Sequence, residues 1–439
     1  MGQNAMANKM MHLGWFCNFM PGEWNAPFAA GWPPWDGKFH VEIAQAMERA
    51  CFDYIMLEDT LMVSEAYGGS AEVTLKHALL APKHDPAPLA TLIGANTSRL
   101  GVVATLSTMA YPPFMLARLC STLDHIAGGR FGWNIVTTGE LTAAQNFGLD
   151  GPPPRELRYE IADEYVELAC KLWDSWDDDA VKVDREAGVY ADFSKVRPVH
   201  HEGKYFKCRG PLNTVPSPQK RPAFVQAGGS SRGRSFAARW ADSVIATAPG
   251  IDGMKAYRDD VRQHAVAWGR NPDDVKVLFL VYPVIAETDE EAFDKHARMV
   301  STPAFVERAL ANASINADID FAQFNLDKPI PKLESTASQG ALDEFAQHGS
   351  GKTLRQLAVE KYDGGGLRLI GTPDRVAARM EEAMQEVGGD GFLISTPYMR
   401  VNRRQVIEVT EGLVPALQWR GVVRKEYTKS TLRETLKEF

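Results

Sequence analysis

The chain has 439 residues, of which 45% are hydrophobic and 24% are charged, as in a globular protein with room for one α/β barrel or two to three smaller domains. Its net charge of −8 excludes a sequence-wide basic field that would hold nucleic acid or an anionic membrane surface. No apolar run approaches the ~20 residues that span a bilayer, and residues 1–11 lack the apolar core of a signal peptide. We therefore expect a cytoplasmic protein with neither a nucleic-acid nor a membrane partner.

The first third of the chain alternates short apolar segments with segments of helical period. It predicts strands at 12–18, 54–57, 100–106 and 131–136, and helices at 39–50, 88–96 and 114–127. The helix at 114–127 has the clearest limits, because Pro112 and Pro113 open it and Gly128 and Gly129 close it. Each strand is thus followed by a helix.

The same alternation continues to the end of the chain. It predicts strands at 223–227, 243–247, 275–286 and 391–395, and helices at 155–176, 231–240, 251–268, from 289 onward, 372–387 and 403–420. The segment at 275–286 is the clearest strand signal, because it is long and almost continuously apolar. Residues 203–206 (GKYF) indicate a hairpin.

Eight strand and helix pairs predict a (β/α)8 TIM barrel. A doubly wound open sheet shares this local pattern, but no glycine fingerprint follows the first strand, as a dinucleotide-binding sheet would need. We predict one domain over residues 1–439, with insertions at about 60–86, 177–221 and 301–366.

Polar residues end several of the predicted strands. Glu58 and Asp59 follow the second strand, Thr105 lies at the end of the third, and Asn134 and Thr138 lie at or beyond the end of the fourth. In a parallel barrel these ends meet at one rim, where ligands bind. One such residue alone would equally fit a turn or a helix cap, but the shared rim favours a binding site.

A Gly/Ser-rich turn links the strand at 223–227 to the next helix. Residues 228–235 (GGSSRGRS) combine two glycines, several hydroxyls and two arginines at a helix N-terminus, which favours a phosphate cradle over a simple helix cap. The spacing resembles a P-loop, but Arg234 replaces the lysine that reaches the terminal phosphates, which argues against nucleotide hydrolysis.

The cysteines and histidines form no metal or redox pattern. The five cysteines are widely spaced, mostly within apolar segments, and no HExxH motif is present. We expect reduced core cysteines and no bound metal. Among the aromatic residues near the first strand, Phe16 and Trp24 are candidates for the wall of a substrate pocket, whereas Trp15 fits the core.

A series of motifs resembles one known family. Residues 128–138 (GGRFGWNIVTT) and 144–148 (AQNFG) are the most specific, and 105–108 (TLST), 226–230 (QAGGS) and 371–373 (GTP) fit the same pattern. They resemble the nitrilotriacetate monooxygenase and dibenzothiophene sulfone monooxygenase family, within the bacterial-luciferase-like flavin enzymes. The resemblance extends over nearly the whole chain.

The resemblance implies a luciferase-like barrel with insertions that uses reduced FMN and O2. A separate NAD(P)H:flavin reductase would supply the reduced FMN. It also implies the cofactor-binding positions, which are Asp59, Thr105, Thr138 and Tyr159, with Ser230 and Ser231 in the phosphate cradle. No residue qualifies as an obligate general acid or base, because the flavin is the reactive group.

One position departs from the family. Where its His-x-x-Arg-Tyr motif begins with histidine, this chain has Arg155. A permanent cation can bind the phosphate but cannot relay a proton at neutral pH. We expect Arg155 to be a phosphate ligand.

The leading hypothesis is therefore the oxygenase component of a two-component FMN-dependent monooxygenase. Its substrate would be a small organic compound containing nitrogen, sulfur or halogen, and the protein would be a homodimer or homotetramer. One alternative is a deazaflavin-dependent oxidoreductase of the same superfamily. Another is a non-catalytic flavin-binding protein.

Overall fold

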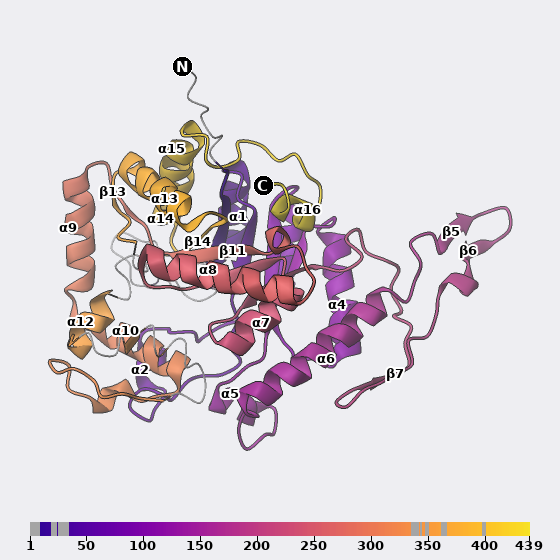
Figure 1. The fold of residues 1–439 in the computed structure, drawn as a ribbon, viewed down its shortest axis with the longest axis horizontal. Coiled ribbons are helices and arrows are strands. Elements are labelled where there is room, and N and C mark those ends of the chain that lie inside the picture. The colour runs from indigo at the N-terminus through magenta and orange to yellow at the C-terminus, as the bar shows by residue number, and fades with distance from the viewer. Residues whose placement is uncertain are drawn as a thin grey trace.

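Eight parallel strands form the centre of the molecule (Figure 1). The computed structural model describes residues 9–18, 24, 35–334, 342, 345–346, 351–360, 367–396 and 401–439. The strands close into a barrel in the order β1-β14-β11-β10-β9-β4-β3-β2. They are β1 (His12–Cys17), β2 (Tyr54–Leu57), β3 (Gly101–Ser107), β4 (Phe131–Val136), β9 (Ala223–Ala227), β10 (Ser243–Ala246), β11 (Lys276–Val281) and β14 (Gly391–Ile394). The predicted TIM barrel is confirmed, and every predicted strand contributes to it.

Helices cover the outside of this barrel. Asp85 caps α3 (Pro86–Asn96) and Thr372 caps α13 (Pro373–Val387), each with a proline at the start of the helix, while Gly388 closes α13 in the left-handed conformation. The covering helices are α1 (Lys38–Arg49), α3 (Pro86–Asn96), α4 (Pro113–Ile126), α6 (Arg155–Trp173), α7 (Ser231–Trp240), α8 (Gly250–Ala267), α13 (Pro373–Val387), α14 (Arg403–Ile407) and α15 (Val414–Trp419). A π-helical turn, Glu408–Leu413, joins the last two.

Two apolar layers follow from the alternation of side chains along the strands. Outward-facing residues such as Trp133 and Phe392 pack against the helices. Inward-facing residues such as Tyr54, Val103 and Leu278 fill the barrel. Because both faces of the sheet are buried, polar groups are confined mainly to the ends of the strands.

The predicted strand at 275–286 is wrong in its extent. Strand β11 ends at Val281, and β12 (Val284–Ile285) leaves the barrel to pair with β13 (Ile370–Gly371). Pro283 lies between them, and proline has no N–H to donate to a strand ladder. The apolar run therefore contributes one strand to the barrel and a second strand to the small β12–β13 sheet.

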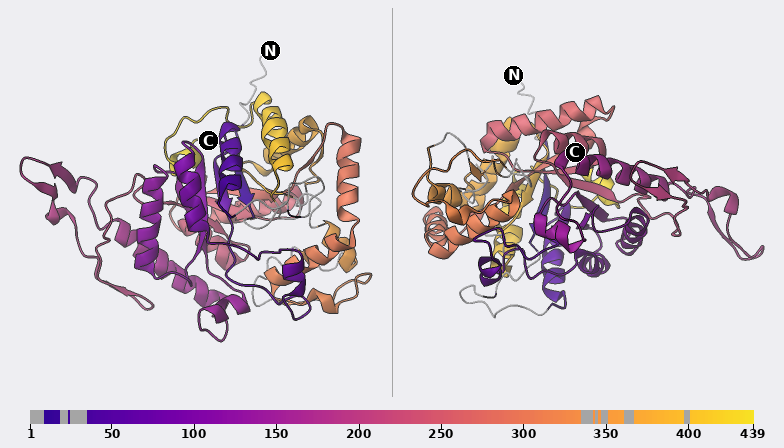
Figure 2. Two further views of the ribbon diagram at one scale, coloured as in Figure 1. Left: turned by 180° about the vertical axis from the view of Figure 1, so that it is seen from behind. Right: turned by 90° about the horizontal axis from the view of Figure 1, so that it is seen from below.

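The three predicted insertions differ in structure. The first contains α2 (Glu72–Lys76), and a further short helix, α5 (Leu141–Asn146), follows β4. The second contains the ribbon of β5 (Val181–Asp184) and β6 (Val189–Ala191), the 3-10 turn η1 (Phe193–Lys195), and the predicted hairpin, formed by β7 (His201–Glu202) and β8 (Lys207–Cys208). Figure 2 shows the β5–β6 ribbon extending far from the barrel.

The third insertion contains helices that its sequence does not predict. It follows α9 (Asp289–Val300) and contains α10 (Pro303–Ala317), η3 (Phe321–Gln323) and α12 (Leu354–Glu360). These elements pack around their own apolar cluster, which includes Phe305, Leu310 and Phe321. Part of this insertion lies outside the described residues.

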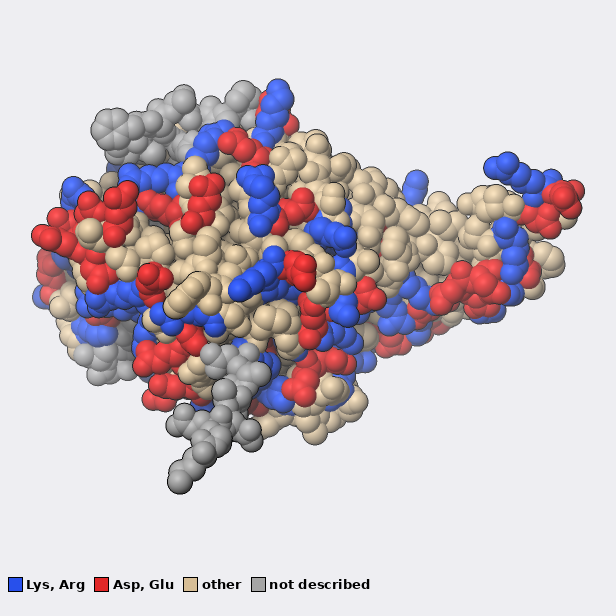
Figure 3. All heavy atoms as spheres, turned by 90° about the horizontal axis from the view of Figure 1, so that it is seen from above, with Lys and Arg blue, Asp and Glu red and all other residues tan. Residues whose placement is uncertain are grey.

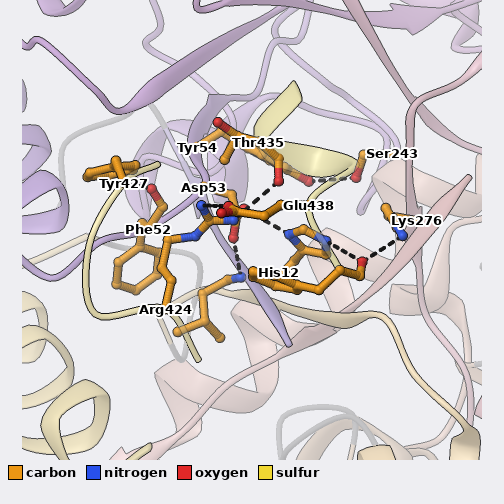
Figure 4. A network of polar contacts seen from close by, with 12 residues as sticks. His12, Phe52, Asp53, Tyr54, Ser243, Lys276, Arg424, Tyr427, Thr435 and Glu438 are labelled. Atoms are coloured by element: carbon orange, nitrogen blue, oxygen red, sulfur yellow. Dashed lines mark hydrogen bonds and ion pairs between the residues drawn. The ribbon is translucent and has the colours of Figure 1, made fainter. Parts of the chain in front are cut away.

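The C-terminal segment closes the end of the barrel where the strands begin. Helix α16 (Leu432–Leu436), which the sequence does not predict, inserts Leu432 and Leu436 into the inner apolar cluster. Next to α16, Asp53 binds three groups (Figure 4): His12 Nδ1 at 2.8 Å, Arg424 Nη2 at 2.6 Å and the backbone N–H of Leu13 at 2.7 Å. Burial alone would raise the pKa of Asp53, but these partners lower it.

Replacement of Asp53 by Asn should destabilise the fold by about 3 kcal/mol, because the buried charge of Arg424 would lose one of its two carboxylate partners and keep only Glu438. Urea denaturation at pH 7 measures this loss. The pKa of Asp53 is lowered in the folded protein. Its ionised carboxylate therefore stabilises the fold above the ordinary carboxyl pKa, and this stabilisation is lost as the pH falls through the lowered pKa. The difference in the free energy of unfolding between wild type and variant should therefore become smaller in acid. A difference that does not depend on pH would contradict this role of Asp53.

Candidate active site

A cavity of about 230 Å³ opens where β2, β3, β4 and β9 end. Six of the seven predicted cofactor-binding residues line it, namely Asp59, Thr105, Thr138, Arg155, Tyr159 and Ser230. The seventh, Ser231, is exposed at the first position of α7 and is not part of the lining. The strand-end topology thus brings together residues that are up to 171 positions apart in the chain.

Hydroxyl groups at the ends of β3 and β4 form the floor of the cavity. Asn134 Nδ2 donates to Thr105 Oγ1 at 2.9 Å, and the hydroxyls of Ser107 and Thr138 are 2.6 Å apart. Thr138 has a φ of +41°, which is unusual for a β-branched residue. Such strain costs on the order of 1–3 kcal/mol and is often found at binding sites. The backbone here directs the Thr138 hydroxyl toward Ser107.

Asp59 is an acid that changes charge near neutral pH. Burial raises its pKa to about 7. Lys83 opposes the shift, whereas Glu58 and Asp85 add to it. Lys83 is itself buried in an ion pair with Glu58, so its positive charge is shared with a second carboxylate. The cavity consequently contains a carboxyl group that can hold a proton at physiological pH.

The opposite end of the cavity suits an anion. Ser230 caps α7 by accepting a hydrogen bond from the Gly233 N–H at 3.1 Å. A side chain at Gly228 would meet the Gly233 carbonyl oxygen at 2.5 Å, so this turn requires glycine. The helix N-terminus adds the partial positive charge of its dipole.

Two arginines add full positive charges beside this turn. Arg155 begins α6 and Arg158 lies one turn later, and both line the cavity. Burial lowers the pKa of Arg158, and the nearby charge of Arg155 acts in the same direction. A phosphate dianion bound between the two guanidinium groups would offset the repulsion between them, so this arrangement suits a phosphate.

The insertions supply the remaining walls. Leu61 and Met62 come from the first insertion and Asn316 from α10 of the third. Thr142 Oγ1 contacts Met62 Sδ at 3.1 Å, and Asn146 Nδ2 donates to the Leu61 carbonyl oxygen at 2.8 Å, so α5 holds this wall in place. Sequence reasoning missed Asn316, because its insertion shows no regular apolar period.

The two predicted substrate-pocket residues lie outside the lining of this cavity. Phe16 packs against the inner apolar cluster of the barrel. Trp24 is 43% exposed, and residues 19–23 and 25–34 on either side lie outside the described residues. Their role stays a prediction.

Other sequence features can be located as well. Four of the five free cysteines are buried, and Cys208 is half-buried. Among the described residues, no group of three or more His, Cys, Asp or Glu side chains could hold a metal ion. Within the same residues, no helix is both long and apolar enough to cross a bilayer.

Comparison with known proteins places the chain in a family. Residues 11–391 match the luciferase-like monooxygenase family, and the chain belongs to it. It is 35% identical to dimethyl-sulfide monooxygenase of Hyphomicrobium sulfonivorans, over 94% of this chain and 86% of that protein. It is 36% identical to nitrilotriacetate monooxygenase component A of Aminobacter aminovorans, over 98% and 97% of the two chains.

A solved structure gives the same result for the fold. Riboflavin lyase (RcaE) with modified FMN and substrate riboflavin superposes with a TM-score of 0.87 at 33% identity, covering 98% of this chain and 96% of that one. The predicted family, fold, FMN cofactor and monooxygenase class are confirmed.

Asp59 should make FMN affinity depend on pH. As the pH rises through about 7, Asp59 becomes negative in the same small cavity as the FMN phosphate, so the affinity for FMN should fall by roughly tenfold. In Asp59→Asn this loss should be absent. Fluorescence titration of FMN between pH 6 and 8 measures both proteins, and the variant corrects for ionisation of the phosphate itself. An identical pH dependence in the two proteins would contradict the role of Asp59.

Proposed function

We propose that this cavity binds reduced FMN and that the chain is the oxygenase component that uses it to oxidise a small organic compound containing nitrogen, sulfur or halogen. The observation that carries the proposal is the polarity of the cavity. One end has two arginines and a helix N-terminus, and the other has hydroxyls and a protonatable carboxyl group. FMN likewise has an anionic phosphate at one end and a polar, hydrogen-bonding ring at the other.

The residues fit the cofactor in type. Arg155 and Ser230 would hold the phosphate, with Ser231 at the outer edge of the turn and Tyr159 beside it. The Ser230 hydroxyl accepts from Gly233, which leaves its own proton to donate to an anion. Asp59, Thr105 and Thr138 would contact the ring.

When bound, reduced FMN supplies the electrons that activate O2. The chain has to position this group and keep water from it, because water and stray protons divert the oxidation. The apolar part of the lining consists of Leu61, Met62, Ile135, Val136 and Ala227. Asp59 can hold a proton at its carboxyl oxygen below about pH 7. Phe16 and Trp24 stay candidates for the substrate side.

The relatives support the substrate class. Their names specify dimethyl sulfide and nitrilotriacetate, which contain sulfur and nitrogen respectively. The insertions that supply Leu61, Met62 and Asn316 are the variable part on which substrate choice would depend. A separate NAD(P)H:flavin reductase, a cytoplasmic location and assembly into a homodimer or homotetramer belong to the same proposal.

Anaerobic addition of reduced FMN, followed by O2 and a panel of small sulfides, amines and halogenated compounds, tests this function. We expect O2 uptake that yields an oxygenated product from at least one compound. Turnover only with reduced deazaflavin would support the oxidoreductase alternative instead. Flavin binding without any oxygenated product across the panel would support a non-catalytic flavin-binding protein.

Removal of the Arg155 charge should weaken FMN binding. Arg155→Ala should raise the dissociation constant by about tenfold or more, because a charge-assisted hydrogen bond contributes ~1.5–3 kcal/mol. Arg155→His should retain most of the activity if phosphate binding is its whole role. Arg404→Ala, at an exposed position on α14, is the matched control and should bind FMN as wild type does. Equal affinity of Arg155→Ala and the control would contradict the proposed phosphate site.

A further inference from the structure

Arg234, which stands where a P-loop would have its lysine, is not part of the cavity lining. It lies on α7, and its Nη1 donates to the Gly229 carbonyl oxygen at 2.6 Å. Its Nε binds the carboxylate of Asp260 on α8, a helix that packs against α7 (Figure 1). Arg234 therefore binds the backbone of the turn between β9 and α7 rather than a ligand in the cavity.

A second side chain binds the neighbouring carbonyl of the same turn. The hydroxyl of Tyr257, on α8, donates to the Gly228 carbonyl oxygen. The Arg234 guanidinium lies over the Tyr257 ring, with Cζ 5.6 Å from the ring centroid. On its other neighbour, Phe279 of β11, the ring packs edge-on with the centroids 6.3 Å apart. Two consecutive carbonyls are thus held by two side chains that contact each other, and Tyr257 also lies outside the cavity lining.

These two contacts fix the direction of two backbone N–H groups. In a trans peptide the C=O and the N–H of the next residue point in opposite directions. The Gly229 N–H therefore points away from Tyr257, and the Ser230 N–H points away from Arg234. Gly229 and Ser230 both line the cavity, and within the described residues neither N–H has a hydrogen-bond partner. Both donors are available to an anion in the cavity.

Such local donors matter because the molecule has no sequence-wide positive field. Its net charge is −8, and acidic and basic side chains are intermixed over the face that Figure 3 shows. A phosphate would therefore depend on short-range contacts at the turn. A hydrogen bond weakens steeply when its angle at the hydrogen falls below about 120°, so a rotated peptide would lose its donor.

We propose that a carbonyl clamp, formed by Tyr257, Arg234 and Asp260, positions the two N–H groups of the turn for the flavin phosphate. This inference rests on the proposed function, because it takes the phosphate to bind at this turn. The clamp holds the two carbonyl oxygens away from the cavity without touching the ligand, and Asp260 fixes Arg234 from α8. Without the clamp, each peptide could rotate and present the partial negative charge of its oxygen to the phosphate. The clamp should therefore affect the affinity for the phosphate and not the affinity for the ring.

The test compares affinities for FMN and for riboflavin, which lacks the phosphate, by fluorescence titration. Tyr257→Phe removes one hydroxyl and no charge. Arg234→Lys keeps the charge but leaves one nitrogen to bind both Asp260 and Gly229. Each variant should bind FMN about three- to tenfold more weakly, the factor that one net hydrogen bond contributes. Riboflavin affinity should be unchanged. Phosphorus NMR of bound FMN gives a second readout, because the chemical shift depends on the hydrogen bonds of the phosphate and should move in both variants.

Two controls change equivalent contacts elsewhere. Tyr427→Phe removes a hydroxyl that donates to the Phe52 carbonyl oxygen at 2.7 Å, at the end of the barrel where the strands begin (Figure 4). Arg262→Lys changes another arginine of α8 that binds one carboxylate and one backbone carbonyl oxygen. The Arg262 side chain is 26% exposed, against 24% for Arg234. Both controls should bind FMN and riboflavin as wild type does.

An equal fall in FMN and riboflavin affinity would show that the clamp variants only perturb the fold, and it would overturn the proposal. FMN affinities equal to those of the controls would also overturn it. Arg155→Ala separates this failure from that of the proposed function. If Arg155→Ala binds FMN weakly while both clamp variants bind it as wild type does, the clamp is wrong and the phosphate site stands. Wild-type affinity in all three variants would overturn both proposals.

Discussion

Closure of eight parallel strands into one barrel is the constraint on which the rest of the structure depends. Closure buries both faces of the sheet, so side chains along the strands must be largely apolar. Polar groups are then tolerated mainly at the strand ends. Because all the strands are parallel, their carboxyl ends meet at one rim and bring Asp59, Thr105, Thr138 and the turn after β9 around a single cavity.

The two ends of the cavity differ in electrostatics, and this difference follows from local structure. The turn between β9 and α7 is tight because Gly228 and Gly233 approach each other, and it exposes a helix N-terminus beside Arg155. Asp59 instead lies where burial outweighs the partly neutralised charge of Lys83. A cation-rich end and an end with a protonatable acid can therefore coexist in one small cavity.

Much of this arrangement could be predicted from the sequence. Strand and helix order follow from apolar periodicity. Six of the residues predicted to bind the cofactor, at positions that the family motifs indicate, line one cavity. The pairing of residues 284–285 with β13 could not be predicted, since an apolar run does not specify which sheet it joins. Ser107 follows Thr105 by two residues and so faces the same side of β3, a signal that could have identified it.

Other features depend on contacts between distant segments. Helix α10 lacks a regular period because it is buried on several sides, so Asn316 gave no signal. The short helix α16 depends on the space inside the barrel rather than on its own propensity. The β5–β6 ribbon has the alternation of an ordinary hairpin, and only the structure reveals that none of residues 181–200 is buried.

A crystal structure of the protein with bound FMN tests the central claim most directly. The account predicts the phosphate at the N-terminus of α7, within hydrogen-bond distance of Ser230 and Arg155, and the ring against the strand-end residues Asp59, Thr105 and Thr138. A phosphate bound at another place, or a ring that contacts none of the three strand-end residues, would contradict it.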